Sequence, residues 1–526
     1  LFDTSNLEAS LSQPAITIEG YELNRDDLQA FYAARNFRAA WDFSTQDQNT
    51  FTGFLDSLTK LVDYHGLERE DYPLDLMQKL GTATDADSKN QLELLVTDSF
   101  IKLAHDLHGD TLDLHDLYPG WNFERTPVDI PTTLAAAVSG NSVNEYFESL
   151  APKNPVYGKL ATALATYRGY ATTEAWPQIS PGPSIKPKEH NPRVAQLRAR
   201  LEAEGYLPQA PISTKASESF TPDVEQALID YQTLNGLATD GAVGSKTLEA
   251  LNTPLPVRID QIRANMERWR HMPDDFPPER YTLVNIPDAA ITITEDGKVI
   301  YKGIVIVGRV DRKTPFIQSN IRSMLINPSW HVPAKIARKD ILPKLREDPH
   351  YLEKQGIVIK DSNGDPYGDK IDWQTISENQ FNFKLRQMPG DLNSLGRLKF
   401  DFDNDFAVYM HGTPHQELFK KNERSLSSGC VRLHDPEEVA QIFMSHNKET
   451  WDIPKLEDSI KSNKTHWVAV AQPMPLDIVY WTVFTDDEGR VNFRKDVYDY
   501  DSFLIANMKG EGTGKAMRLD QGPDKH

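Results

Sequence analysis

The chain has 526 residues, of which 39% are hydrophobic and 25% charged. This composition is ordinary for a globular protein. The chain is longer than a domain with a single hydrophobic core usually is, so we expect several domains. The formal net charge of -20 repels phosphate backbones and anionic lipid surfaces, which argues against nucleic acid and membrane surfaces as partners.

The single cysteine, Cys430, excludes internal disulfides and multi-cysteine metal sites. It is therefore either an inert buried side chain or a reactive thiol. The chain has no long apolar run, and its first residues, LFDTSNLEAS, lack the basic flank and apolar core of a secretion signal. A processed, mature chain would look the same, so the location has to be inferred from the function.

The stretch 1–176 is predicted to be a mostly helical domain. Apolar residues at helical spacing predict a helix over 51–65 that is ended by Gly66. The same pattern predicts a second helix over 92–108, ended by Gly109. Such stripes are typical of a core, and neither carries visible chemistry.

A linker and a small module are predicted to follow. Five prolines between 176 and 193 predict the linker, and 191–252 contains three short helical patterns, the second opened by Thr221 and Pro222. The segment GAVGSKT resembles a phosphate-binding loop, but Ser245 interrupts the required Gly-Lys pair and no buried strand precedes it. We therefore reject a nucleotide site, and leave open whether the module binds glycan, binds peptide or is a spacer.

From Tyr281 onward the apolar period changes to two, and Asp296-Gly297 is a hairpin signal. Asp435-Pro436 predicts a helix that begins shortly after Cys430. Further strand-like runs occur at 321–326, 400–406, 408–410, 431–433, 467–470 and 478–483.

The stretch 333–389 departs from the strand pattern. It combines a polar helical segment with a Gly/Asp-rich loop at 360–370. Insertions of this length between strands are often lids or binding loops, so we expect a lid over the sheet.

The segment YMHGTPHQELFKKNERSLSSGCVRL contains the chemistry. His411 follows an apolar strand, and Cys430 comes nineteen positions later. A thiol with a pKa of ~8.5 is mostly protonated at neutral pH, so a nucleophilic cysteine needs a base, and histidine is the usual one. The amides of Gly429 and Cys430 could stabilise an oxyanion, and the guanidinium of Arg432 suits a carboxylate.

Several nearby residues have more than one interpretation. His415 lies four positions after His411, but Gly412 and Pro414 forbid the regular helix that a zinc site would need, so we predict no metal. His331 is interpreted either as a residue of the site or as a packed core residue.

Two aromatic residues are candidates for the wall of the site. Trp330 could flank a bound peptide or simply bury area. Tyr409 shares a strand face with His411 if the strand is regular that far.

The pattern HGT, a variable loop and SSGCVRL resembles the signature of the L,D-transpeptidase (YkuD) catalytic domain, and specifically its large YcbB-like branch. The blocks TPF, NPSWHVPAKIARKDILP and RQMPGDLNSLGRLKF resemble successive blocks of that branch, and together the resemblance covers 258–501. DGAVGSKT and its helices resemble a type-one peptidoglycan-binding domain, and FYAARNFRAAW resembles the helical scaffold of the branch.

The resemblance implies a multidomain α+β protein in four parts. These are a helical scaffold domain at 1–176, a three-helix peptidoglycan-binding module at 191–252, a mostly β catalytic domain at 258–505 with the lid insertion at 333–389, and a C-terminal tail at 506–526.

The resemblance also implies roles for individual residues. Cys430 would be the acyl-accepting nucleophile and His411 the general base and later acid, with the carbonyl of Gly412 orienting the imidazole. Arg432 would bind a substrate carboxylate. Ser428 stands where many relatives carry a second histidine, so it is a candidate substrate contact without a role in proton transfer.

The implied reaction is attack on the bond after diaminopimelate in a tetrapeptide stem, release of D-alanine and transfer to an amine of a second stem, which makes a 3-3 cross-link. The expected partners are donor and acceptor stems, carbapenems that acylate Cys430, and other wall synthases; no cofactor is expected, and the expected location is the periplasm. The alternatives are a cysteine carboxypeptidase or hydrolase, an enzyme that attaches lipoprotein to the wall, and a non-catalytic wall-binding scaffold.

Overall fold

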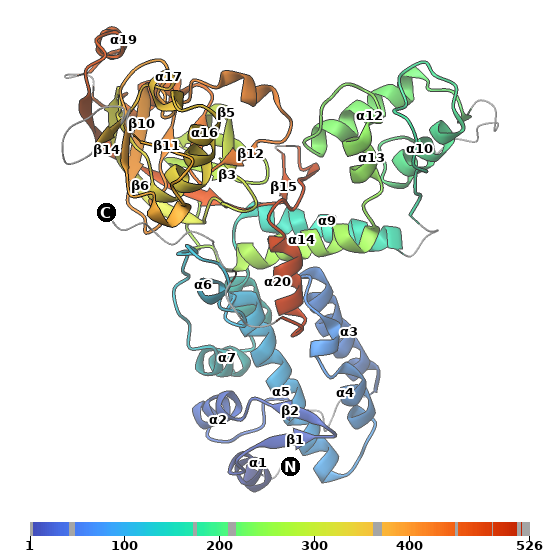
Figure 1. Ribbon diagram of the computed structural model, residues 1–526. Helices are drawn as coiled ribbons and strands as arrows, with labels where there is room; N and C mark the ends of the chain where they lie inside the picture. The colour runs from blue at the N-terminus through green and yellow to red at the C-terminus, as the bar shows by residue number, and fades with distance from the viewer. Residues whose placement is uncertain are drawn as a thin grey trace. The chain divides into compact units, whose positions relative to one another are not determined.

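The computed structural model describes residues 4–41, 48–171, 176–208, 217–360, 371–447, 451–486, 488–512 and 517 (Figure 1). The chain forms two compact units. The first comprises Leu1–Leu114, Phe123–Phe276 and Thr482–Lys515, and the second comprises His115–Asn122, Pro277–Trp481 and Ala516–His526.

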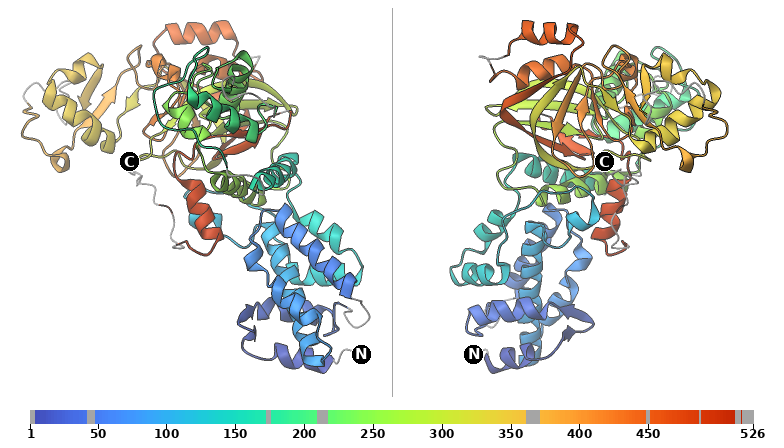
Figure 2. Two further views of the ribbon diagram at one scale, coloured as in Figure 1. Left: turned by 90° about the vertical axis from the view of Figure 1, so that its right-hand side faces the viewer. Right: turned by 60° about the vertical axis from the view of Figure 1, so that its left-hand side comes forward.

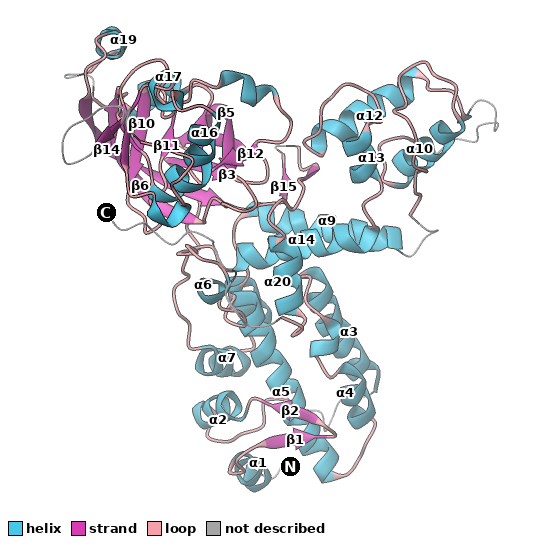
Figure 3. Cartoon of the chain, in the orientation of Figure 1, coloured by secondary structure: helices cyan, strands magenta, loops and turns pink. Residues whose placement is uncertain are grey.

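The first unit is mostly helical (Figure 3). Its helices are α1 (Thr4–Leu11), α2 (Arg25–Ala34), α3 (Gln48–Tyr64), η1 (Arg69–Asp71), α4 (Leu74–Gly81), α5 (Ala86–His108), α7 (Ile130–Ser139), α8 (Val143–Leu150), α9 (Pro155–Ala171), α10 (Pro192–Ala203), α12 (Pro222–Leu234), α13 (Ser245–Leu251), α14 (Leu255–Arg270) and α20 (Tyr500–Met508). Two short strand pairs accompany them, β1 (Ile16–Ile18) with β2 (Tyr21–Leu23) and β15 (Val483–Thr485) with β16 (Val491–Phe493).

The two predicted helices of the N-terminal domain are confirmed as α3 and α5. Gly66 and Gly109 follow them with φ angles of 71° and 85°, in the left-handed region that glycine adopts without strain. Their apolar stripes pack into one buried core, as the periodicity predicted.

The predicted three-helix module is also confirmed. It consists of α10, α12 and α13, which share a buried apolar core. Thr221 occupies the N-cap of α12 and Pro222 its first turn. GAVGSKT forms the turn that leads into α13, and its Val243 makes an isolated β-bridge with Ile185.

The first unit also contains both ends of the predicted catalytic domain, 258–276 and 482–505. The reason is a set of buried polar contacts made by α14. Arg268 forms an ion pair with Asp501 at 2.6 Å, and Thr482 donates to the same carboxylate at 2.5 Å. These charges are far apart in the sequence, so no local pattern predicts their pairing.

The second unit is built on a nine-stranded sheet among the described residues, in the order β12-β5-β13-β11-β10-β6-β14-β3-β4. A further pairing of β4 with β5 closes the sheet on itself, with β12 outside the ring. Its strands are β3 (Tyr281–Asn285), β4 (Ala290–Glu295), β5 (Lys298–Gly308), β6 (Ile317–Ile326), β10 (Leu398–Phe402), β11 (Met410–His411), β12 (Ser425–Ser427), β13 (Val431–Leu433) and β14 (His466–Val479). Helices α6 (Leu114–Leu117), α18 (Pro436–Phe443) and α19 (Ile453–Lys461) and the short η4 (Gln416–Lys420) complete it.

The predicted hairpin at Asp296-Gly297 is confirmed between β4 and β5, and the helix after Cys430 is confirmed as α18. Four strand predictions were wrong in extent. The run 400–406 leaves the sheet after Phe402, and only Met410 of the run 408–410 lies in a strand, β11. The run 467–470 and the first two residues of the run 478–483 are joined within β14, whose register shifts between Ala469 and Met474. A bulge of this kind bends a strand without interrupting it, which hides its continuity in the sequence.

The insertion at 333–389 forms a separate lobe beside the sheet (Figure 2, left). Its predicted helical segment is present, but it also contains the strands β8 and β9, which the sequence did not predict. They form a three-stranded sheet, in the order β7-β9-β8, with β7 just before the insertion. The lobe has an apolar core of its own. Most of the Gly/Asp-rich loop, 361–370, lies outside the described residues. The elements are β7 (Trp330–His331), α15 (Ala334–Ile336), η2 (Ala337–Ile341), α16 (Leu342–Glu347), α17 (Tyr351–Lys354), β8 (Ile357–Lys360), η3 (Glu378–Gln380) and β9 (Lys384–Gln387).

Among the described parts of the chain, no helix combines the length and the apolar character needed to cross a bilayer.

Candidate active site

Two short parallel strands bring the predicted catalytic residues together. In the pairing of β11 with β13, Met410 lies opposite Val431 and His411 opposite Arg432. The amide of Val431 donates to the carbonyl of Tyr409 at 3.1 Å. Cys430 directly precedes β13, so the nucleophile candidate and the base candidate come from neighbouring strand ends.

His411 is almost completely buried, with 5% of its surface exposed. Its Nδ1 lies 2.5 Å from the carbonyl oxygen of Gly412, which accepts the ring hydrogen. This bond fixes the tautomer and leaves Nε2 with the lone pair that a base needs. Burial, with a smaller effect of the Arg432 cation, lowers the pKa of His411 to about 3, so the ring is neutral at neutral pH.

Cys430 is a free, partly exposed cysteine. Burial raises the pKa of its thiol, although hydrogen bonding to Tyr409 and the charge of Arg432 act in the opposite direction. The resting site therefore contains a neutral thiol and a neutral imidazole. General-base activation of a thiol starts from this protonation state of both groups.

The structure brings Tyr409 to the thiol and Trp330 to Tyr409. The side chain of Tyr409 hydrogen-bonds with those of Cys430 and Trp330, and burial raises its pKa well above the usual value. The ring centroids of Tyr409 and His411 are 5.6 Å apart. His331, the next residue of β7, has an exposed side chain, so its interpretation as a core residue was wrong.

Arg432 supplies the predicted cation. Its side chain is largely buried, and burial lowers its pKa. Among the described residues its buried Nε has no hydrogen-bond partner. A carboxylate that reached this guanidinium would satisfy a donor that the protein itself leaves unmatched.

The predicted oxyanion role of Gly429 needs a correction. Its amide donates to the hydroxyl of Ser427 at 3.1 Å, and that hydroxyl donates to the carbonyl of Cys430 at 2.6 Å. Gly429 has a φ angle of 111°, which turns its peptide into this local bond. The Gly429 amide is therefore already hydrogen-bonded within its own loop, and only the amide of Cys430 stays a predicted oxyanion donor.

Ser428 has a partner that the sequence did not indicate. The guanidinium of Arg312 donates to its hydroxyl at 2.9 Å and also forms a two-point ion pair with Asp340 of η2. Arg312 is 5% exposed. A single buried side chain thus connects the loop that contains Ser428 and Cys430 (the nucleophile loop, after the predicted role of Cys430) with the insertion.

The hydroxyl of Thr314 is a second brace of the loop. It accepts from the amide of Gly308 at 2.8 Å and donates to the carbonyl of Gly429 at 2.8 Å, in a fully buried position. We expect Thr314→Val to lower the free energy of unfolding by ~1–3 kcal/mol, because a buried donor and acceptor lose their partner. Thr314→Ser keeps the hydroxyl and is the matched control. Chemical denaturation of both variants measures the difference; a loss in Thr314→Ser without one in Thr314→Val would show that the methyl group matters instead of the hydroxyl.

Lys399 is a site residue that sequence analysis missed. It pairs with His411 across β10 and β11, and its ammonium lies 4.4 Å from the ring centroid of Tyr409. Its charge helps to lower the pKa values of both His411 and Cys430. The alternating pattern LKFDF places Lys399 on the face opposite the buried Phe400, which was the available signal.

His415 is exposed and lies 3.5 Å from Glu417. The described residues contain no group of three histidine, cysteine or acidic side chains that could hold a metal ion.

A family model described as the L,D-transpeptidase catalytic domain (YkuD) matches residues 279–448. This chain contains a YkuD-type L,D-transpeptidase domain. A model described as a "Putative peptidoglycan binding domain" matches 190–251, and one described as a scaffold domain matches 26–164. The resemblance to the family and the predicted fold class, helical scaffold, three-helix module and β-rich catalytic domain, are thereby confirmed.

A curated protein of Haemophilus influenzae named "Putative L,D-transpeptidase" is 30% identical over 304 residues. The alignment covers 56% of this chain and 60% of the relative, so the chain spans less than two thirds of the relative's length.

Three solved structures are more distant. They are the L,D-transpeptidase of Stackebrandtia nassauensis (13% identity, 58% of this chain and 96% of that chain, TM-score 0.19), the L,D-transpeptidase of Xylanimonas cellulosilytica (12%, 57% and 99%, 0.17) and the Ldtfm-avibactam carbamoyl enzyme (10%, 43% and 64%, 0.19). Scores this low support no conclusion about fold or function.

Proposed function

We propose that the chain is a cysteine L,D-transpeptidase of the large YcbB-like branch that forms 3-3 cross-links between peptidoglycan stems. The YkuD-type domain supports the class of reaction. The observation that carries the proposal is the parallel register of β11 and β13, which sets His411 opposite Arg432 and beside the strand end where Cys430 lies.

In the proposed acylation, the thiol of Cys430 attacks the carbonyl carbon of diaminopimelate while Nε2 of His411 accepts its proton. The amide of Cys430 stabilises the oxyanion. Collapse of this intermediate breaks the bond to D-alanine, whose amine takes the proton from His411. Arg432 binds a carboxylate of the donor stem during this step.

In the proposed transfer, the side-chain amine of a second diaminopimelate attacks the thioester. His411 now accepts a proton from the amine and returns it to the departing thiol. The enzyme is regenerated and the two stems are joined by an amide bond. Water in place of the amine would turn the same site into a carboxypeptidase.

The test is product analysis by mass spectrometry after incubation with a disaccharide tetrapeptide. We expect release of D-alanine and a dimer joined through diaminopimelate. Tripeptide without dimer would show a hydrolase, and unchanged tetrapeptide would show a binding scaffold; either outcome contradicts the proposal.

We propose further that the insertion at 333–389 acts as a lid that limits hydrolysis. The support is Arg312, which holds Asp340 of the insertion and Ser428 of the nucleophile loop at the same time. Charge-assisted hydrogen bonds in buried positions are among the stronger polar contacts. A movement of the lid would therefore change the position of the loop that contains Ser428.

Asp340→Asn weakens this contact while it keeps the shape of the side chain. We expect the ratio of transfer to hydrolysis to fall by about tenfold or more, since a hydrogen bond to a charged group contributes ~1.5–3 kcal/mol and ~1.4 kcal/mol corresponds to tenfold. Asp348→Asn is the control, because that carboxylate of the same insertion pairs with exposed Lys354. An unchanged ratio in Asp340→Asn would contradict the proposal that Arg312 couples the insertion to the loop that contains Ser428.

The proposed substrate determines the proposed location. Peptidoglycan lies outside the cytoplasm, and one of the matched models is described as a putative peptidoglycan-binding domain. We therefore assign the enzyme to the periplasm, with donor and acceptor stems as substrates, other wall synthases as partners, and carbapenems as acylating inhibitors of Cys430.

A further inference from the structure

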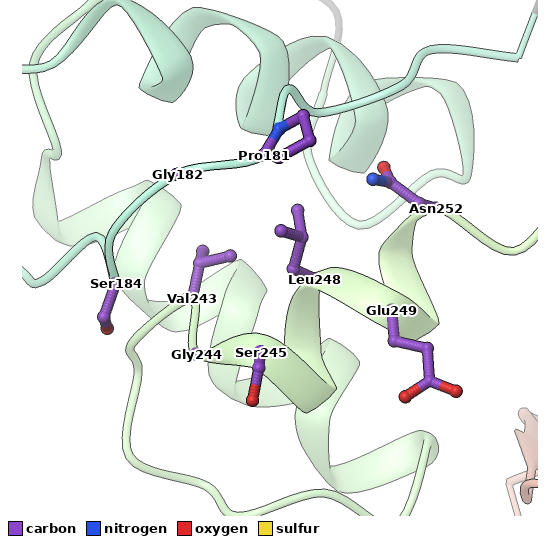
Figure 4. Close-up of a pocket in the computed structure, with 9 residues that line it drawn as sticks. All are labelled: Pro181, Gly182, Ser184, Val243, Gly244, Ser245, Leu248, Glu249 and Asn252. Atoms are coloured by element: carbon purple, nitrogen blue, oxygen red, sulfur yellow. The ribbon is translucent and has the colours of Figure 1, made fainter.

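Two cavities of the first unit have the size of small-molecule sites. One, of about 500 Å³, lies in the three-helix module between the loop at Pro181 and α13 (Figure 4). Figure 4 shows the hydroxyl of Ser245 and the carboxylate of Glu249 pointing away from Pro181, so these polar groups do not select a ligand for it. The other cavity, of about 570 Å³, has a buried polar side chain in its wall.

This second cavity, which we call the scaffold cavity, lies within the region that the scaffold model matches. Its lining comes from the last turn of α3 and the following His65, from α8, and from the segment that leads from α8 into α9. All of these residues belong to the first unit. The model that matches 26–164 is described only as a scaffold domain, so it assigns no ligand to this cavity.

The buried polar side chain of the scaffold cavity is His65, with 6% of its surface exposed. Its Nδ1 lies 2.9 Å from the hydroxyl of Tyr157, and the guanidinium of Arg270 donates to the same hydroxyl at 3.1 Å. Because a guanidinium can only donate, the hydroxyl accepts from Arg270 and still has its own hydrogen to give. Among the described residues, Nδ1 of His65 is the acceptor within reach of that hydrogen. The ring of His65 therefore carries its own hydrogen on Nε2.

The hydrogen on Nε2 is a donor that the protein does not use. In the part of the chain that the structure describes, Nε2 has no hydrogen-bond partner, and it is accessible rather than enclosed by protein atoms. Burial and the nearby Arg270 cation lower the pKa of His65 to about 3, so the ring stays neutral and keeps this tautomer at neutral pH. The wall of the scaffold cavity thus presents an uncharged N–H group, which selects a ligand with a hydrogen-bond acceptor.

The remaining lining is mostly apolar and has no net charge. It includes the rings of Tyr64 and Phe147, and Tyr64 is 47% exposed. The charged residues of the lining are Lys153 and Glu148, which have opposite signs. The net charge of -20 of the whole chain also disfavours an anion. The lining therefore suits an uncharged ligand with an apolar group, and exposed aromatic rings favour an aromatic one.

We propose that the scaffold cavity binds a small uncharged molecule in which an aromatic group carries a carbonyl oxygen. The carbonyl oxygen accepts the hydrogen on Nε2 of His65, and the aromatic group packs against Tyr64 and Phe147. The scaffold region would thus have a ligand site of its own. The proposal does not depend on the proposed function, since no residue of the site belongs to the catalytic domain.

The test is saturation-transfer NMR on the full chain with 3-phenylpropionamide, which joins a phenyl ring to an uncharged carbonyl group. Gly158→Leu fills the cavity, since Gly158 of α9 lines it and a Cβ there meets only the hydroxyl of Tyr64, at 3.9 Å, within 4 Å. Gly158→Ala is the small control. Gly169→Leu places the same leucine at an exposed position of the same helix, outside the lining. We expect transfer to the ring protons in wild type and in both controls, and its loss in Gly158→Leu.

Two further measurements keep the test decisive if Gly158→Leu does not fold. Tyr64→Ala removes an exposed ring and should weaken binding about two- to tenfold, the usual contribution of an aromatic pair. On the wild type, 3-phenylpropylamine has the same ring and chain but no acceptor once it is protonated, and 3-phenylpropionate has a charged one; both should bind more weakly than the amide. Absent transfer from the wild type, equal transfer to all three compounds, or unchanged transfer in a folded Gly158→Leu would overturn the site. Each of these results would leave the proposed function untouched.

Discussion

Replacing Cys430 by alanine is expected to abolish covalent labelling by a carbapenem completely. The attack needs a thiol, and Cys430 is the only cysteine of the chain. Intact-protein mass spectrometry after incubation should show the wild type heavier by one inhibitor and the Cys430→Ala variant unchanged. The variant should also release no D-alanine from a disaccharide tetrapeptide.

Because the chain has a single cysteine, a thioester adduct can form at only one position, and the mass increase can be assigned without further mapping. A mass increase in Cys430→Ala would place the nucleophile on a hydroxyl, with Ser427 and Ser428 as the nearest alternatives in sequence. Such a result would contradict the cysteine mechanism. Unchanged thermal unfolding of the variant serves as the control that its fold is intact.

The elements that the sequence predicted share a short-range cause. Helix α5 is specified by its apolar stripe and ended by Gly109, and the β4–β5 hairpin by period-two alternation around Asp296-Gly297. That Cys430 and His411 lie at neighbouring strand ends was also predictable, since a thiol and a base within one short segment form a chemical pattern. All of this information lies within a few turns of chain.

The contacts that complete the site depend on register and could not be predicted in this way. Lys399 reaches Tyr409 only because β10 pairs with β11 in one particular alignment. Thr314 and Arg312 brace a loop more than a hundred residues away in the sequence. A hydroxyl or a guanidinium in a loop carries no local signal of a partner at that distance.

The incorrect expectations have a similar origin. The amide of Gly429 was expected to face the substrate, but the hydroxyl of Ser427 competes for it within the same turn. The buried pair of Arg268 and Asp501 joins 482–505 to the first unit, although the β pattern suggested the catalytic domain. Both cases are decided by which polar partner satisfies a buried group, a choice that hydrophobic periodicity does not encode.

Replacing His411 by asparagine is expected to slow acylation of Cys430 by about 10²–10⁴-fold, the usual contribution of a positioned general base. Stopped-flow acylation with a carbapenem measures the rate. His65→Asn is the matched control, because His65 is also buried with a pKa lowered to about 3 but lies in the first unit. The control should lose stability and keep its acylation rate; equal rates in wild type and His411→Asn would remove His411 as the base.

The pH dependence of acylation tests whether the thiol of Cys430 and the imidazole of His411 are both neutral in the resting site. Because burial lowers the pKa of His411 from 6.5 to about 3, its base form persists as the pH falls through 6.5, and the acid limb of the rate should lie well below that value. Arg432→Gln removes a cation that lowers this pKa, so it should move the limb upward. Stability should also decrease toward acid pH. Below pH 6.5 the unfolded imidazole takes up a proton while the folded one does not, so the free energy of unfolding decreases as the pH falls from 6.5 toward 3. An acid limb at 6.5 or above would show that the pKa of His411 is not lowered in the folded protein, which contradicts the effect expected of its burial.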